Sequence, residues 1–179
     1  MEQGGAKKPQ GGFMDNAIGG RTIREYLNMI KMPLLALIGL NILSFLMGLL
    51  GYMPGIGFAL GPIGWLVSLI IGLVSLVIAG YIGYVAVKTY SGDLLVSMVA
   101  GALAGLLSGI VSGVLGVISA GIAMSMGIGM GLGSAIIMSA ALVGVIISPI
   151  FGAIVGGILA LIGGAIAGAR SFGTPAAKK

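Results

Sequence analysis

The side chains that carry most enzyme chemistry are scarce in this sequence. Its 179 residues include no cysteine and no histidine, which excludes disulfides, thiolate metal sites and the commonest general base. No paired carboxylates, Ser/His/Asp set or cluster of metal ligands is present, and the long apolar stretches contain no acidic residue. We therefore predict no catalytic residue, no metal and no cofactor, and we expect that the protein is not an enzyme.

Two glycine-containing segments partly match nucleotide-binding motifs. The segment "GIGMGLG" at residues 127–133 has the glycines of a dinucleotide fingerprint, but it follows no predicted strand and precedes no acidic ribose ligand. The segment "GYVAVKT" at residues 83–89 lacks the glycine directly before lysine that a phosphate-binding loop needs. Neither segment predicts a nucleotide site.

Composition points to a membrane protein. The chain is 58% hydrophobic, only 7% charged and has a mean hydropathy of +1.20, whereas soluble domains are about 25% charged. Residues 32–87 and 94–169 contain no charged side chain, and uncharged apolar runs longer than about 18 residues are typical of membrane spans. We predict an all-α integral membrane protein with a membrane domain at 33–169, whose four transmembrane helices lie at about 33–52, 62–87, 94–118 and 144–169.

The charged residues predict the orientation of these helices. With four spans, all nine basic residues and all four acidic residues fall on one side of the membrane. The positive-inside rule then places both termini in the cytoplasm, for a protein of the cell membrane. We predict no nucleic-acid partner, and we expect contact with anionic lipid headgroups from Arg21, Arg24, Lys31, Lys88 and Arg170.

Three shorter segments flank the spans. Residues 1–20 and 170–179 have the composition of cytoplasmic tails, the first flexible and rich in Gly and Lys, the second basic. Between tail and span, Thr22 and Glu25 match a capping box, and apolar residues then recur at helical spacing. We predict an amphipathic interfacial helix at 21–32 that breaks at Pro33; a continuous extension of the first span is the alternative.

Residues 119–143 are uncharged and rich in Gly and Met. Two readings stay open for them: the third and fourth helices extend around a glycine-rich turn near 127–133, or the segment re-enters the membrane. Irregular backbone at membrane depth is tolerated only where protein covers it or water reaches it. We therefore favour the helical extension.

Small residues recur at every fourth position in the last two spans. The third span carries Ser97, Gly101, Gly105, Gly109 and Gly113. The fourth carries Gly144, Ser148, Gly152, Gly156, Ala160, Gly164 and Gly168. Because lipid gives helices no hydrophobic reason to associate, such series let helices meet at backbone distance. We predict glycine-zipper packing of the third helix against the fourth or against a neighbouring copy; a glycine-lined oligomeric pore is the alternative.

Asn41 is the most polar residue of the predicted spans. We expect its side chain to make an interhelical hydrogen bond worth about 1 kcal/mol. Contact with a substrate is the alternative, because intramembrane polar groups often mark functional sites.

One stretch carries a family resemblance. Residues 79–109 resemble a pattern of small glycine-rich four-span membrane proteins, mostly archaeal and of unknown function. The matching positions are Ala79-Gly80-Tyr81, Gly92-Asp93, Gly101 and Ala104-Gly105. The resemblance implies a four-helix topology and no activity.

These observations predict a structural or accessory membrane component. It would assemble with copies of itself or with other membrane subunits through helix packing. A channel or membrane-permeabilising protein built from the same glycine series is the alternative function.

Overall fold

The structure is a computed structural model that describes residues 17–18, 20–53, 56–127 and 132–168. These residues form helices α1 (Ile23–Gly51), α2 (Ile56–Lys88), α3 (Leu94–Ser125) and α4 (Leu132–Ile166), preceded by a short ladder of β1 (Ala17–Ile18) and β2 (Arg21–Thr22). All four helices are long and apolar enough to cross a membrane. The protein is therefore a helical multi-pass membrane protein, as predicted.

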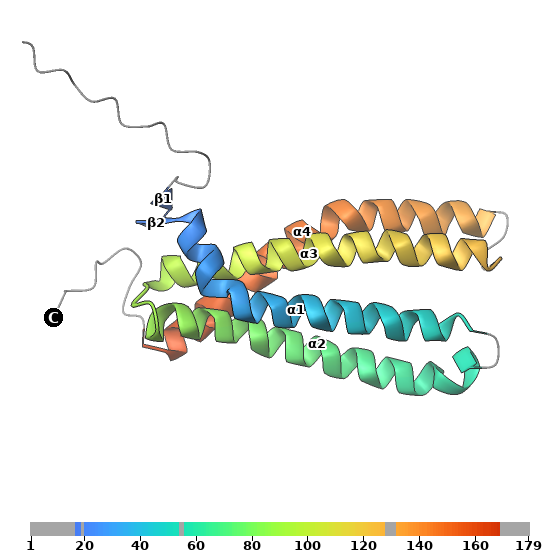
Figure 1. The fold of residues 1–179 in the computed structure, drawn as a ribbon, viewed down its shortest axis with the longest axis horizontal. Coiled ribbons are helices and arrows are strands. Elements are labelled where there is room, and N and C mark those ends of the chain that lie inside the picture. Colours follow the sequence, from blue (N-terminus) through green and yellow to red (C-terminus); the bar gives the residue numbers. More distant parts are fainter. Residues whose placement is uncertain (1–16, 19, 54–55, 128–131, 169–179) are drawn as a thin grey trace, which may run out of the picture.

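The helices form two antiparallel hairpins, α1–α2 and α3–α4 (Figure 1). Helices α1 and α3 start at the end of the bundle where α2 stops, so α1 and α3 run parallel. We call this the charged end, because the charged residues of the described chain gather there: Arg21, Arg24, Glu25, Lys31, Lys88 and Asp93. The opposite end, where each hairpin turns, is the loop end.

Local capping signals place the starts of α1 and α3. The Thr22 hydroxyl accepts a hydrogen bond from the Glu25 backbone N–H at 3.3 Å, and the Glu25 carboxylate accepts one from the Thr22 N–H at 2.8 Å. This pair is the predicted capping box. Asp93 caps α3 in a similar way, because its carboxylate accepts a hydrogen bond from the Val96 N–H at 2.8 Å.

Helix α1 does not break at Pro33, contrary to the favoured reading of residues 21–32. It runs without interruption from Ile23 to Gly51 with Pro33 inside it. Proline has no N–H, so the carbonyl of Met29 loses its usual partner and the helix bends instead of ending. Figure 1 shows this change of direction after the first turns of α1. Residues 23–32 are therefore an extension of the first span.

Residues 119–143 are mainly helical. Helix α3 continues to Ser125, where Gly127 adopts a φ of +77° in the following turn, and α4 begins at Leu132. The third and fourth helices thus extend beyond the predicted spans, in agreement with the favoured reading, while the fourth helix ends at Ile166, before the expected 169. The two helices have 32 and 35 residues. They are about 50 Å long, which exceeds a hydrocarbon core of about 30 Å.

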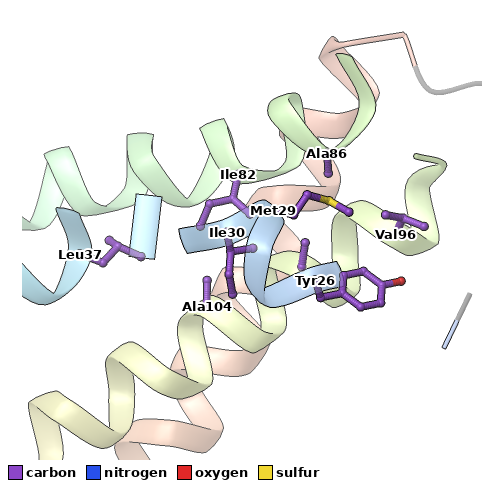
Figure 2. Packing of buried hydrophobic residues seen from close by; sticks show 9 residues of the cluster. Tyr26, Met29, Ile30, Leu37, Ile82, Ala86, Val96 and Ala104 are labelled. Atoms are coloured by element: carbon purple, nitrogen blue, oxygen red, sulfur yellow. The ribbon is translucent and has the colours of Figure 1, made fainter. Parts of the chain in front are cut away.

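The best-packed region lies toward the charged end (Figure 2). There Tyr26 and Ile30 of α1 pack with Ile82 of α2 and Ala100 and Ala104 of α3, all nearly inaccessible. Toward the loop end the hairpins separate (Figure 1). In the most apolar stretch of 18 residues of each span, 33% of the residues of α3 are buried inside the molecule, but only 6% of those of α1 and of α2. The bundle is therefore tight at one end and open at the other.

Candidate functional site

Helices α3 and α4 meet at backbone distance. A methyl group on Gly105 would lie 1.9 Å from the carbonyl oxygen of Gly152, and one on Gly152 would lie 2.3 Å from the carbonyl oxygen of Gly105. Both distances are far inside van der Waals contact, so this position requires glycine on each helix. Of all helix pairs in the described chain, α3 and α4 share the most extensive contact.

The rest of the predicted α3 series also faces α4. Methyl groups on Gly101, Gly109 and Gly113 would lie 2.3, 2.5 and 2.9 Å from the backbone of Gly156, Ser148 and Val145 respectively. On α4, Ala160 is completely buried, and a methyl group on Gly164 would lie 2.5 Å from the Ser97 Oγ atom. The contact therefore follows the small residues from Gly113 toward the charged end.

Two predicted packing residues behave differently. A methyl group on Gly144 would have no neighbour within 4 Å, because the contact has shifted to Val145 at this level. Gly168 lies beyond the end of α4 with a φ of +91°, and its N–H donates to the Ala165 carbonyl at 3.0 Å. It closes the end of the helix, as a glycine in this conformation commonly does, and it does not pack against α3.

A second close contact, between α2 and α4, was missed by the sequence analysis. A methyl group on Gly83 would lie 1.7 Å from the carbonyl oxygen of Ala160, and one on Gly163 would lie 1.8 Å from that of Gly80. Gly83 ends a series of small residues at spacing four, Ser75, Ala79 and Gly83, in the second span, where no close packing was predicted. Helix α4 is thereby held at backbone distance by α2 and α3 together.

Ser97 lies where these three helices converge. Its side chain is fully buried, and its hydroxyl contacts the carbonyl oxygens of Gly83 at 3.3 Å and Asp93 at 3.1 Å. Apart from Tyr26, no other side chain with a hydrogen-bonding group is buried in the described ranges. The hydroxyl thus joins α3 to α2 directly beside the contact with Gly164.

Asn41 makes the interhelical contact that was expected of it. Its Nδ2 atom donates hydrogen bonds to the Ser108 carbonyl oxygen at 3.2 Å and to the Ser108 Oγ at 2.8 Å. Three turns further on, the hydroxyls of Tyr52 and Ser119 are 3.1 Å apart. In each pair the two residues are 67 positions apart in the chain, so α1 and α3 keep the same register over this length.

A cavity of about 200 Å³ lies between these two hydrogen-bonded pairs. We call it the polar gap, and its walls come from α1 and α3: Asn41, Ser44, Phe45, Gly48, Ser112, Leu115, Gly116 and Ser119. Methyl groups on Gly48 or Gly116 would meet nothing within 4 Å. Unlike α3 and α4, these two helices do not use their glycines for close contact.

The predicted membrane-surface residues lie at the charged end. Arg24, Lys31 and Lys88 are exposed, while the Arg21 guanidinium donates a hydrogen bond to the Tyr90 carbonyl and so joins the segment before α1 to the α2–α3 connection. Arg170 lies outside the described residues. The exposed residues are thus free to face a headgroup layer.

In the described ranges, no group of three or more His, Cys, Asp or Glu side chains could hold a metal ion. Comparison of the chain with family models, curated proteins and solved structures finds no match. The resemblance of residues 79–109 to glycine-rich four-span proteins stays a prediction. The functional argument therefore rests on helix packing and on the polar gap.

Proposed function

We propose that the protein is a non-catalytic structural or accessory component of the cell membrane that assembles with copies of itself or with other membrane subunits. The observation that carries this proposal is the contrast between two parts of the bundle. Helix α4 is held at backbone distance by α2 and α3, whereas the loop-end halves of α1 and α2 have little of the chain against them. A firmly packed unit with an apolar, unpartnered hairpin is suited to contact other membrane helices.

In this proposal the α3–α4 contact is a glycine zipper within one chain. Absent side chains bring the two backbones together, so that dispersion contacts stabilise an association that lipid does not drive. Toward the charged end, the small residues of α3 and α4 already contact each other within one chain. Assembly with other subunits must therefore use a different surface.

Helix α2 offers such a surface. Gly64, Ser68 and Gly72 are spaced four residues apart, Ser68 and Gly72 are exposed, and methyl groups on either glycine would meet nothing within 4 Å. Large apolar side chains flank this groove, among them Leu69 and Leu73. Small-xxx-small grooves are the usual site of close helix association in membranes. We therefore assign the contact with the next subunit to this face of α2.

The mass and composition of the complex extracted from membranes in mild detergent test this proposal. We expect the wild-type chain to be recovered in a complex, and Gly72→Leu to release it while its thermal stability stays unchanged. Gly39→Leu is the matched control, since Gly39 also faces open space but has leucines, not small residues, four positions away on either side. A wild-type chain recovered only as a monomer contradicts the proposal.

We further propose that both termini are cytoplasmic and that the charged end lies at the inner headgroup layer. Since the chain has no cysteine, a Lys88→Cys variant carries one thiol. We expect an impermeant thiol reagent to label it in inside-out vesicles and not in right-side-out vesicles. Labelling in right-side-out vesicles alone would instead place the charged end on the outer side of the membrane.

The polar gap favours a second candidate, a channel or permeabilising protein. Hydroxyl and amide groups at membrane depth can line a water path. Conductance across planar bilayers separates the candidates, because an assembled scaffold leaves it at the background level and a pore raises it.

A further inference from the structure

We infer that the polar gap admits water and binds a small uncharged molecule carrying hydroxyl groups. This inference stands apart from the proposed assembly, because the two involve different faces of the bundle. Assembly is assigned to the outer face of α2, whereas the pocket lies between α1 and α3.

The first support is the state of two serine hydroxyls. Ser75, Ser125 and Ser139 each donate a hydrogen bond to a carbonyl of their own helix, at 2.8 to 3.0 Å. This is the usual way to satisfy a hydroxyl in an apolar helix. The hydroxyls of Ser44 and Ser112 line the polar gap and make no hydrogen bond within the described part of the chain. They are therefore available to an occupant.

Asn41 supplies a third group. Both of its hydrogen bonds to Ser108 are donated by Nδ2, and the amide orientation is determined because the Ser108 carbonyl can only accept. The Oδ1 atom is left without a donor among the described residues. Since none of their buried side-chain oxygens lacks a partner, Oδ1 must be accessible from outside the protein. Because Asn41 lines the polar gap, its Oδ1 atom is an acceptor that an occupant can reach.

The second support is that the polar gap is held open. Gly48 and Gly116 would let α1 and α3 approach closely, yet both face open space. The Asn41–Ser108 and Tyr52–Ser119 contacts sit at either end of the gap and act as spacers between the helices. The helices therefore keep a cavity that their own sequence would allow them to close.

The polar gap is closed at the charged end. Leu37 and Ala104 lie one turn nearer the charged end than Asn41 and Ser108. They too are 67 positions apart in the chain, and their side chains are 7% and 1% exposed. They belong to the well-packed core shown in Figure 2. Within one copy of the chain, water that enters the polar gap therefore stops at Asn41, so the gap of a single copy is a pocket.

The lining determines the chemistry of the occupant. It contains no charged side chain, and an ion at membrane depth without a counter-charge is strongly disfavoured. A purely apolar occupant would leave two hydroxyls and the Asn41 Oδ1 atom without partners. A small hydroxyl-bearing molecule satisfies these groups, while its carbon atoms contact Phe45 and Leu115. A cavity of about 200 Å³ is many times the roughly 10–15 Å³ that one water needs by the same measure, so it has room for a molecule such as glycerol.

The natural absence of cysteine makes this testable. In proteoliposomes of the full chain, Ser44→Cys and Ser112→Cys place a single thiol on opposite walls of the polar gap. Ser75→Cys on α2 is the matched control, because that hydroxyl is bonded within its own helix. We expect a water-soluble thiol reagent to modify both gap variants at least about tenfold faster than the control, because thiolates form poorly in apolar surroundings.

Two further experiments test the pocket and its ligand. Adding Gly116→Leu to Ser44→Cys should fill the polar gap and slow the modification to the rate of the control. Glycerol, used as the probe, should slow the modification of both gap variants at concentrations where propane, which has no hydroxyl group, does not.

The outcomes separate the possible occupants. If both gap variants react as slowly as the control with the water-soluble reagent but rapidly with a lipid-soluble maleimide, lipid fills the gap and the inference is wrong. If both react rapidly but glycerol gives no protection, the gap holds water alone and the ligand assignment fails. Rapid reaction of both variants, with protection by glycerol, supports the whole inference.

Discussion

Gly105 and Gly152 face each other so closely that a methyl group on either would overlap the carbonyl oxygen of the other, at 1.9 and 2.3 Å. This reciprocal contact marks the closest part of the α3–α4 interface. It means that neither position tolerates a side chain unless the helices move apart. The interface of the hairpin is therefore a sensitive place to perturb the fold.

A leucine at position 105 tests this contact. We expect Gly105→Leu to destabilise the protein by more than the roughly 1–3 kcal/mol of a typical overpacked core, because it forces α3 away from α4 over several turns. Thermal unfolding in detergent measures the effect. Gly121→Leu on the same helix is the control, since a methyl group there meets nothing within 4 Å. Equal stabilities for the two variants would refute the packing argument.

The contact between α2 and α4 predicts an effect from a single methyl group. A Cβ atom at position 83 would lie 1.7 Å from the Ala160 carbonyl oxygen, so Gly83→Ala should be destabilising by about 1–3 kcal/mol. In an open helical position the same change is favourable or neutral, because alanine has the better helix propensity. Gly39→Ala on α1 provides that comparison. A Gly83→Ala protein that resists heat as well as Gly39→Ala would show that α2 and α4 do not meet at this point.

The Asn41–Ser108 pair should contribute a measurable coupling. We expect Asn41→Leu to lower the free energy of unfolding by about 0.6–2 kcal/mol, the range of interhelical hydrogen bonds in membranes. Ser108→Ala should lose less, because Nδ2 of Asn41 keeps the backbone carbonyl as a partner. A double-mutant cycle measures the side-chain coupling. A coupling of zero would mean that the two side chains do not interact.

The N-cap of α3 gives a prediction at the charged end. Asp93→Ala removes the acceptor of the Val96 N–H and should cost about 0.5–2 kcal/mol. Asp93→Ser keeps a capping oxygen without the charge, so it should restore most of the loss. Hydrogen exchange of the first turn of α3 reports the effect locally. Equal exchange in the alanine and serine variants would argue against a capping role.

Much of the architecture followed from the sequence. The long uncharged stretches predicted four membrane helices, and all four are present. The capping box at Thr22 and Glu25 also formed as expected. These features depend on hydropathy and on backbone groups a few residues apart, so no knowledge of the tertiary structure was needed to predict them.

Other features could not be predicted from spacing alone. Gly144 continues the series that contains Gly152, yet a methyl group on it would meet nothing within 4 Å, because the contact with Gly113 has passed to Val145 at this level. Gly83 and Gly163 lie outside the two predicted series but make the second close contact. Pro33 bends α1 without ending it, since the packed core around Tyr26 and Ile30 holds both sides of the bend together.

The sequence by itself thus determined that the chain forms four apolar helices with small-residue faces, because helix formation and membrane insertion depend on local composition. Only the tertiary structure decided which faces meet, that α4 packs against both α2 and α3, and that α1 and α3 keep a polar gap in a single register. The physical reason is that lipid gives helices no hydrophobic preference for one neighbour over another. The choice of partner is left to shape and to a few hydrogen bonds between residues far apart in the chain.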